Sequence, residues 1–373
     1  MMKNTFAMGL FILAVVLGGT YFTNTSSLFN ATFGTDINGL PEAQSTQMVE
    51  LKNGETFNLT ASIVKKMIAG TEVKMLAYNG SIPGPIIKVP KGAEITINFT
   101  NKTDVSTTIH SHGVRLDNMF DGVPGMTQKE VGVGKSFVYK IKFPDEGVYW
   151  YHPHVREDYA QELGLYGNYL VVSNDPAYWS PVNQEVTLMV DDILVENGKV
   201  APFGPIVDHS LMGRFGNVML VNGSDHYAVA AKEGEIIRFY ITNTANTRVF
   251  NLSIPGAKVK LVGGDNGKYE RETFVSSVLL GPSERAVIEV LFDTPGTYIL
   301  EHKTPNRTYA MGTMTVSSEK VSTMYKQQFL KLRTNSDTIE SIDPLRQYFN
   351  KKADKNIAFT VDMGMGGGHM MPN

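Results

Sequence analysis

The stretch GAEITINFTN, residues 92–101, alternates apolar and polar side chains and is rich in β-branched residues. This pattern is typical of a β-strand with one buried face. A related stretch, GEIIRFYITN, occupies residues 234–243, and the two lie 234 − 92 = 142 residues apart. Because solenoid repeats are only about 20–50 residues long, so distant a recurrence indicates two copies of one domain.

Two further pairs of segments support the duplication. Asn79-Gly-Ser81 recurs as Asn222-Gly-Ser224, and GVYWYH at residues 147–152 matches GTYILE at residues 296–301. Short β-rich segments separated by Gly, Asn and Pro turns favour antiparallel sandwiches over helical folds. We therefore predict an all-β chain of tandem Greek-key β-sandwiches.

The predicted sandwiches occupy residues 45–175 and 180–318. The boundary falls where Ser-Asn-Asp-Pro, residues 173–176, supplies turn chemistry after a strand. Residues 319–373 are expected to begin as a partly helical linker and to contain a further strand at residues 356–361.

The N-terminus resembles an export signal. Lys3 precedes an apolar run from Phe6 to Leu17, which is too short for a comfortable membrane span. No clean cleavage site follows, so residues 1–24 are predicted to be either a signal peptide or an uncleaved N-terminal anchor. Either assignment places the protein outside the cytoplasm, in the periplasm or the extracellular space.

Composition excludes some classes of partner and of ligand. The 373 residues carry a net charge of −3, and no basic run is present. We therefore expect no nucleic-acid partner, and membrane contact only through an N-terminal anchor. The chain contains no cysteine, so it supplies neither a disulfide nor a thiolate metal ligand.

Four of the eight histidines form two pairs, His110-Ser-His112 and His152-Pro-His154, in strand-like surroundings. Residues i and i+2 of a strand point to the same face, roughly 7 Å apart, so each pair can direct two imidazoles toward one metal centre. Imidazole ligands without thiolate suit copper, zinc, nickel or iron, so these residues alone do not select the metal.

The repeat provides an internal control for these histidines. The segments align His110 and His112 with Leu252 and Ile254, and His152 and His154 with Glu301 and Lys303. A lone histidine is usually structural, but four paired ones that the second copy lacks are predicted to be metal ligands. His302 is one place out of register with these positions and is expected to lie at the surface or to hydrogen-bond. His209 and His226 are isolated and are assigned structural roles.

Two longer motifs resemble the copper motifs of the multicopper oxidases, which include the laccases. HSHGVRLDNMFDGVPGMTQ, residues 110–128, is similar to the first motif; YWYHPH, residues 149–154, with GLYGNYLVV, residues 164–172, is similar to the second. The resemblance covers residues 50–316 and implies cupredoxin domains one and two of that family. The strand expected at residues 356–361 resembles the start of a third cupredoxin domain, truncated here, so residues 319–373 are expected to be a linker and that start. The resemblance also implies one-electron oxidation of a reducing substrate coupled to reduction of O2 to water.

The resemblance further implies roles for individual residues. His110 would bind the type 2 copper, while His112, His152 and His154 would bind the type 3 pair. Asp121 matches an acidic residue that delivers protons during O2 reduction. The alternative role for Asp121 is a turn residue before Gly122.

The sequence departs from the family pattern at the type 1 copper site, which requires a cysteine. The chain also offers four of the eight cluster histidines that the family takes from two domains. We therefore expect an N-terminal portion, a fragment or truncated gene product, that is inactive alone and requires a third-domain polypeptide or a homo-oligomer. The alternative is a non-catalytic periplasmic protein that binds or sequesters copper.

Two further expectations concern the C-terminal segment and the surface beside the histidines. The end of the chain resembles a Met- and Gly-rich insert, and is either a copper-acquiring segment or a flexible loop; its soft-ligand candidates are Met363, Met365, His369, Met370 and Met371. An open aromatic face is also expected beside the histidines, near His112, Met119, Phe120, Tyr151 and Tyr159.

Overall fold

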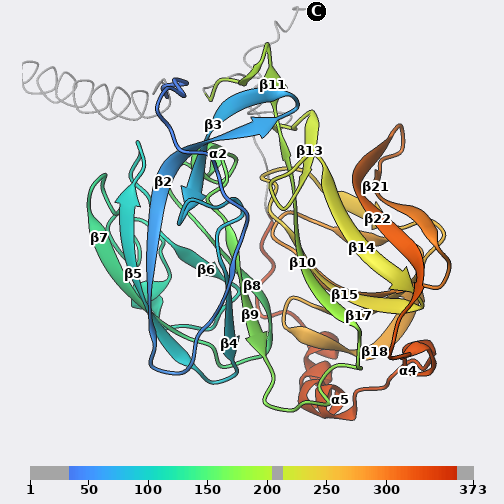
Figure 1. The fold of residues 1–373 in the computed structure, drawn as a ribbon. Coiled ribbons are helices and arrows are strands. Elements are labelled where there is room, and N and C mark those ends of the chain that lie inside the picture. Colours follow the sequence, from blue (N-terminus) through green and yellow to red (C-terminus); the bar gives the residue numbers. More distant parts are fainter. Residues whose placement is uncertain (1–32, 204–212, 359–373) are drawn as a thin grey trace, which may run out of the picture.

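The computed structural model describes residues 33–203 and 213–358. Two β lobes lie side by side, the first drawn in blue to green and the second in yellow to orange (Figure 1). Each lobe is built from two sheets, as expected for the tandem sandwiches. The prediction of an all-β fold is confirmed.

The first lobe pairs a five-stranded sheet, in the order β1-β4-β9-β8-β6, with a four-stranded sheet, β3-β2-β5-β7. Its strands are β1 (Met48–Glu50), β2 (Thr56–Ile68), β3 (Thr71–Tyr78), β4 (Ile86–Pro90), β5 (Glu94–Lys102), β6 (His110–His112), β7 (Ser136–Lys142), β8 (Gly147–His152) and β9 (Gly167–Val172). Two short helices belong to this lobe: η1 (Asn118–Phe120) and α2 (Glu157–Ala160).

The second lobe pairs a six-stranded sheet, β13-β10-β15-β20-β17-β18, with a five-stranded sheet, β14-β22-β21-β16-β19. Its strands are β10 (Gln184–Ile193), β13 (Val218–Val221), β14 (Tyr227–Glu233), β15 (Glu235–Asn243), β16 (Phe250–Ser253), β17 (Lys258–Gly264), β18 (Gly267–Val275), β19 (Val278–Leu280), β20 (Arg285–Phe292), β21 (Gly296–Lys303) and β22 (Thr308–Lys320). A small hairpin, β11 (Val195–Glu196) and β12 (Lys199–Val200), follows β10.

The repeated stretch forms the equivalent strand in each lobe. β5 pairs with β2 in parallel and with β7 in antiparallel, and β15 pairs likewise with β10 and β20. Along β5 the apolar side chains face the core and the polar ones from Glu94 to Thr100 face outward, as the alternation predicts, while Asn101 is buried. β15 is buried on both faces, because its outer face packs against the first lobe, where Tyr240 meets Val148 and Leu170. The interface between the lobes therefore explains the weaker alternation of the second copy.

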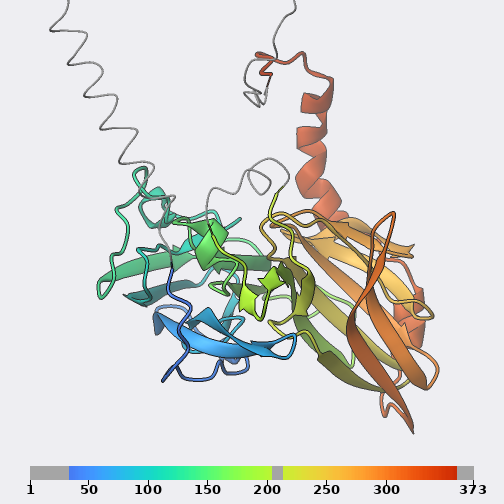
Figure 2. The same ribbon diagram turned by 90° about the horizontal axis from the view of Figure 1, so that it is seen from above.

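The chain after β22 is partly helical. It contains α4 (Lys326–Leu330), α5 (Ser336–Ile342) and η2 (Asp343–Asn350), and the helical segment projects from the second lobe (Figure 2). Asp337 of α5 pairs with Lys268 of β18 at 2.8 Å, which ties the segment to that lobe. Asn356, Ile357 and Ala358 form no strand, and the rest of the strand expected there lies outside the described residues.

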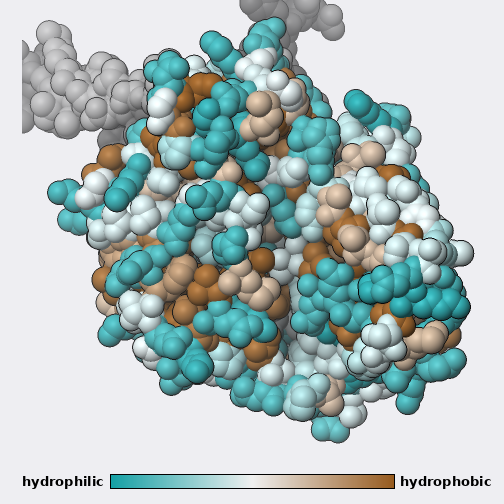
Figure 3. Space-filling view, viewed as in Figure 1, coloured by the Kyte–Doolittle hydropathy of each residue, from teal (hydrophilic) through white to brown (hydrophobic). Residues whose placement is uncertain are grey.

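The described part of the chain contains no helix long and apolar enough to span a membrane. The predicted export signal or anchor, residues 1–24, lies outside that part. Polar and apolar residues are interspersed on the face drawn in Figure 3. The domain boundaries at residues 45–175 and 180–318 stay predictions.

Candidate metal centre

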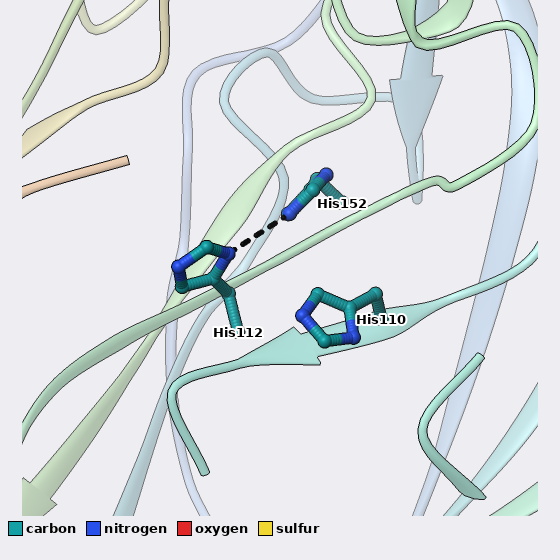
Figure 4. Close-up of side chains that lie close together, drawn as sticks. All are labelled: His110, His112 and His152. Atoms are coloured by element: carbon teal, nitrogen blue, oxygen red, sulfur yellow. Dashed lines mark hydrogen bonds between the residues drawn. The ribbon is translucent and has the colours of Figure 1, made fainter. Parts of the chain in front are cut away.

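The antiparallel pairing of β6 with β8 brings the two histidine pairs together. His110 lies opposite His152, and His112 lies opposite Trp150. Residues directly opposite each other in such a ladder project from the same face of the sheet. The candidate ligand nitrogens of His110, His112 and His152 lie within 4.8 Å of one another, and their rings converge (Figure 4).

His154, two residues beyond the end of β8, completes the cluster. The centre of its ring lies 4.4 Å from that of His110 and 5.1 Å from that of His152. Its backbone N–H donates to the hydroxyl oxygen of Thr108 at 3.2 Å, which fixes the chain where it leaves the strand. All four predicted ligands therefore lie in one cluster.

Hydrogen bonds at the far side of three rings determine which nitrogen carries the proton. The Nδ1–H groups of His110 and His152 donate to the carbonyl oxygens of Asp121 and Pro153, at 2.7 and 3.0 Å. His154 uses Nδ1 in the same way toward Glu157 Oε1 at 2.5 Å. Because these oxygens accept, Nε2 of each ring keeps its lone pair, which is the arrangement that metal-binding histidines adopt.

Burial favours the uncharged form of three rings of the cluster, those of His110, His112 and His152. It lowers the pKa of His110 and holds the pKa of His152 well below its ordinary value. Burial, followed by the nearby positive charge of Arg285, lowers the pKa of His112 to about 4. Neutral imidazole is the form that binds a metal ion, so at neutral pH these rings need not lose a proton first.

Asp121 contacts His110 in two ways: its backbone carbonyl accepts the Nδ1–H, and its carboxylate lies beside the ring. Its carboxylate Oδ1 is 3.2 Å from His110 Nδ1, and its side chain is 30% exposed to solvent. The next residue, Gly122, has φ +78°, and a Cβ there would overlap the carbonyl group of Ile109. Only glycine allows this close approach. The turn role and the place beside His110 are therefore compatible.

Two residues of the site were not singled out from the sequence. Glu157, three residues after His154, orients that histidine, and its spacing in a turn was the available signal. Trp150 stacks on His152, with ring centres 4.0 Å apart and planes 16° apart. Trp150 is fully buried, so it fixes the plane of the His152 ring from one side.

The predicted open aromatic face is wrong in part. Tyr151 and Tyr159 are buried, at 0% and 1% exposure, because one packs in the first-lobe core and the other stacks on Phe33 at 3.6 Å. Of the residues named for that face, Met119 is 54% exposed.

His302 takes the second of the two roles expected for it. It is 2% exposed, and its Nδ1 accepts a hydrogen bond from the backbone N–H of Asn251 at 3.0 Å, so it is a hydrogen-bonding residue within the lobe and not a surface one. An irregularity between Leu300 and Glu301 shifts the register of β21, and His302 pairs with Leu252. By strand pairing, His302 and not Glu301 therefore corresponds to His152.

Among the described residues, His226 does not join the cluster either. The side chain of His226 is 89% exposed and lies near Asp225, whereas His209 lies outside the described residues. The soft-ligand candidates of the C-terminal segment, residues 363–371, also lie outside them.

The arrangement fits a metal ion. Nδ1 of His112 and Nε2 of His152 face each other at 3.3 Å. Bonds from a metal to imidazole nitrogen are about 2.0–2.1 Å long, so both atoms can reach one ion. Softness alone would admit copper, zinc, nickel or iron.

Comparison with known families identifies the metal chemistry. Two family models, both described as multicopper oxidase, match residues 61–176 and 168–325. The first contains all four clustered histidines.

Relatives of the chain carry the same description. It is 31% identical to multicopper oxidase MmcO of Mycobacterium tuberculosis (strain ATCC 25618 / H37Rv), covering 62% of this chain and 50% of the relative. It is 25% identical to copper resistance protein A of Escherichia coli, covering 84% and 56%. The chain thus spans about half the length of these curated relatives.

Solved structures of multicopper oxidases resemble this chain in both fold and sequence. Lac15 from a marine microbial metagenome is 30% identical with a TM-score of 0.62, covering 72% of this chain and 68% of that one. A multi-copper oxidase from Pseudomonas Thermotolerans is 27% identical with a TM-score of 0.66, covering 74% and 66%. The chain belongs to the multicopper oxidase family.

Proposed function

We propose that the chain provides the copper-holding part of an oxidoreductase that oxidises a reducing substrate by single electrons and reduces O2 to water. The observation that carries this proposal is the cluster of four imidazoles within the matched family region. Three of these rings already have their Nδ1–H groups bonded to oxygen, so their Nε2 atoms are available to a metal.

The four histidines divide into proposed roles. His110 would hold the type 2 copper, and His112, His152 and His154 the type 3 pair, as the family resemblance implies. Bound copper would supply the one-electron chemistry that connects substrate oxidation to O2. The chain's own contribution is rigid placement: β6 and β8 hold the rings in register, and Trp150 covers one face of His152.

Asp121 is proposed to carry protons. Formation of water consumes protons, and a carboxylate between solvent and the cluster can take them up and release them inward. The partial exposure of Asp121 and its contact with His110 suit this task. The proton would be held on a carboxylate oxygen, while the backbone carbonyl of the same residue keeps His110 oriented.

The rest of the catalytic machinery is proposed to come from residues outside this sequence. The chain contains no cysteine, so a second copy of it would bring no thiolate either. A third-domain polypeptide with an H-C-H motif would supply the thiolate and the remaining histidines. We propose that the protein works outside the cytoplasm, in agreement with its N-terminal sequence.

The test is O2 uptake by the copper-loaded chain, with a phenol as electron donor. Alone, the chain is expected to bind copper without intense blue colour and without O2 uptake above background. Addition of the H-C-H polypeptide should produce both, and His152→Ala should abolish the uptake. Steady turnover by the chain alone would contradict the proposed division of the machinery, and failure to bind copper would contradict the whole proposal.

The second candidate function is a non-catalytic copper-binding or copper-sequestering protein. The imidazole cluster of this chain would suffice for it, because a carrier needs no electron entry site. The same experiment separates the two candidates. Copper binding without O2 uptake, even in the presence of the H-C-H polypeptide, would support the carrier.

A further inference from the structure

We propose that Arg285, a residue of the second lobe, positions the histidine-bearing strands of the first lobe and makes the site favour Cu(I) over Cu(II). The inference rests on the proposed copper site. It gives the second lobe, which contributes no residue to the histidine cluster, a direct influence on the metal held there.

Arg285 begins β20, and its side chain is 3% exposed. Its Nε–H donates across the interface between the lobes to the carbonyl oxygen of Val148 at 2.8 Å. Val148 belongs to β8, four residues before His152. Within its own lobe, Arg285 donates from Nη1 to the carbonyl oxygen of Ser283 at 2.8 Å. The guanidinium therefore bonds to its own lobe through Nη1 and to β8 of the first lobe through Nε.

The same guanidinium lies against the chain that leaves β6. A Cβ atom at Gly113, the residue after His112, would be 2.8 Å from Arg285 Nη2. Gly113 also has φ +82°, a conformation that other residues rarely adopt. Arg285 therefore lies against the residue that follows β6, next to His112, and donates to β8 upstream of His152.

The charge of Arg285 is only partly compensated. Guanidinium remains protonated in proteins. The acid paired with it, Asp265, lies 3.5 Å from Nε, and its side chain is 43% exposed, so solvent screens this partner. The guanidinium lies against Gly113, the residue after His112, so its positive charge is held close to that ligand. By charge repulsion, a doubly charged copper ion on that ring is destabilised more than a singly charged one.

A neighbouring contact between the lobes also supports β8. The amide Nδ2 of Asn168 donates to the carbonyl oxygen of Tyr149 and to the hydroxyl of Thr242, at 3.0 and 2.9 Å. Thr242 of β15 is the strand partner of Arg285. Asn168 belongs to β9 of the first lobe, so the second lobe holds β8 directly at Val148, through Arg285, and indirectly at Tyr149, through Asn168.

The experiment measures the affinity of the full chain for each copper ion separately. Bicinchoninate competes for Cu(I) and glycine competes for Cu(II), so the ratio of the two affinities requires no enzymatic turnover. Arg285→Met should shift this ratio toward Cu(II) by roughly tenfold or more, the size expected for one buried charge within about 12 Å of the ion at an effective dielectric constant of about 20. Arg285→Lys, which keeps the charge, should restore most of the Cu(I) preference.

A second variant tests the charge of Arg285 while leaving Arg285 in place. Asp265→Asn deletes the partly compensating charge but keeps an oxygen that can accept the Arg285 backbone N–H, now bonded at 2.7 Å. The ratio should then move toward Cu(I), opposite in sign to Arg285→Met. The matched control is Arg115→Gln, which deletes a cation three residues after His112 whose side chain is 74% exposed; its effect should stay below about twofold.

The outcomes separate this inference from the proposed function. If the unmodified chain binds no copper, the proposed site itself fails. If it binds copper but Arg285→Met changes both affinities equally, or Asp265→Asn shifts the ratio toward Cu(II) or not at all, the influence of Arg285 on the copper ion is refuted. Should Arg285→Met not fold, Asp265→Asn alone decides.

Discussion

The two lobes share a strand plan but differ at one place. In the first lobe, β6 and β8 set His110 opposite His152; in the second, the equivalent strands β16 and β21 set Leu252 opposite His302. One histidine is therefore present in both lobes. The difference shows that neither the strand pairing nor a buried histidine is sufficient for a metal site.

The hydrogen bonds of the shared histidine explain why. His152 donates from Nδ1 to a carbonyl oxygen and keeps the lone pair of Nε2 facing His112. His302 accepts at Nδ1 from the Asn251 backbone, so its proton is on Nε2, which is buried and has no hydrogen-bond partner within residues 33–203 and 213–358. The second lobe thus presents a proton where the first presents a lone pair, and an aliphatic residue where the first presents His110.

The largest expected effect separates these two histidines. His152→Ala should weaken copper binding by more than about a thousandfold, because loss of an outer partner of a ligand already costs roughly 10–100-fold. His302→Ala, the matched control, should leave copper affinity unchanged within about twofold. Titration of each variant against a competing chelator measures this. Equal losses in the two variants would end the distinction between the lobes.

The next effect concerns stability, and it should appear in the second lobe. Leu252 is 3% exposed within the core, so Leu252→Ala should lower the free energy of unfolding by about 2–4 kcal/mol without changing copper affinity. Leu279 lies on the adjacent strand and is 68% exposed, so Leu279→Ala should cost no more than about 0.5 kcal/mol. Denaturant unfolding of the copper-free chains provides the measurement. A copper defect in Leu252→Ala would show that the second lobe's aliphatic residues do affect the site.

The smallest effect tests the support around a single ligand. Glu157→Gln should weaken copper binding by about tenfold, because the carboxylate that accepts from His154 Nδ1 is replaced by a neutral amide. Asp225 lies beside His226, which is outside the cluster, so Asp225→Asn should have no effect on copper affinity. The same chelator titration applies. An unchanged affinity in Glu157→Gln would mean that His154 needs no such orientation.

The fold was predictable because the decisive signals are local and repeated. The alternation in residues 92–101, its recurrence at residues 234–243 and the turn residues between strands all depend on neighbours in the sequence. The cluster of His110, His112, His152 and His154 followed from their i, i+2 spacing in strands. The assignment of each histidine to a copper type, and the role of Asp121, stay predictions.

The remaining features depend on contacts between distant segments. Alignment of the repeats places Glu301 at the position of His152, and only the irregularity in β21 reveals that His302 takes that place. Tyr151 and Tyr159 were expected at an open face, but Phe33 and the first-lobe core cover them. Arg285 lies 137 residues after its partner Val148, so no sequence pattern connects it with the copper motifs.

The central claim is that copper binds to the imidazole cluster of the first lobe. X-ray absorption spectroscopy of the full chain, loaded with one equivalent of Cu(I), tests it most directly, because nitrogen and sulfur neighbours of copper give different scattering. The account predicts a first shell of imidazole nitrogen without sulfur, lost in His152→Ala and retained in His302→Ala. A first shell of thioether sulfur, unaffected by His152→Ala, would place the copper on methionines instead and would contradict the account.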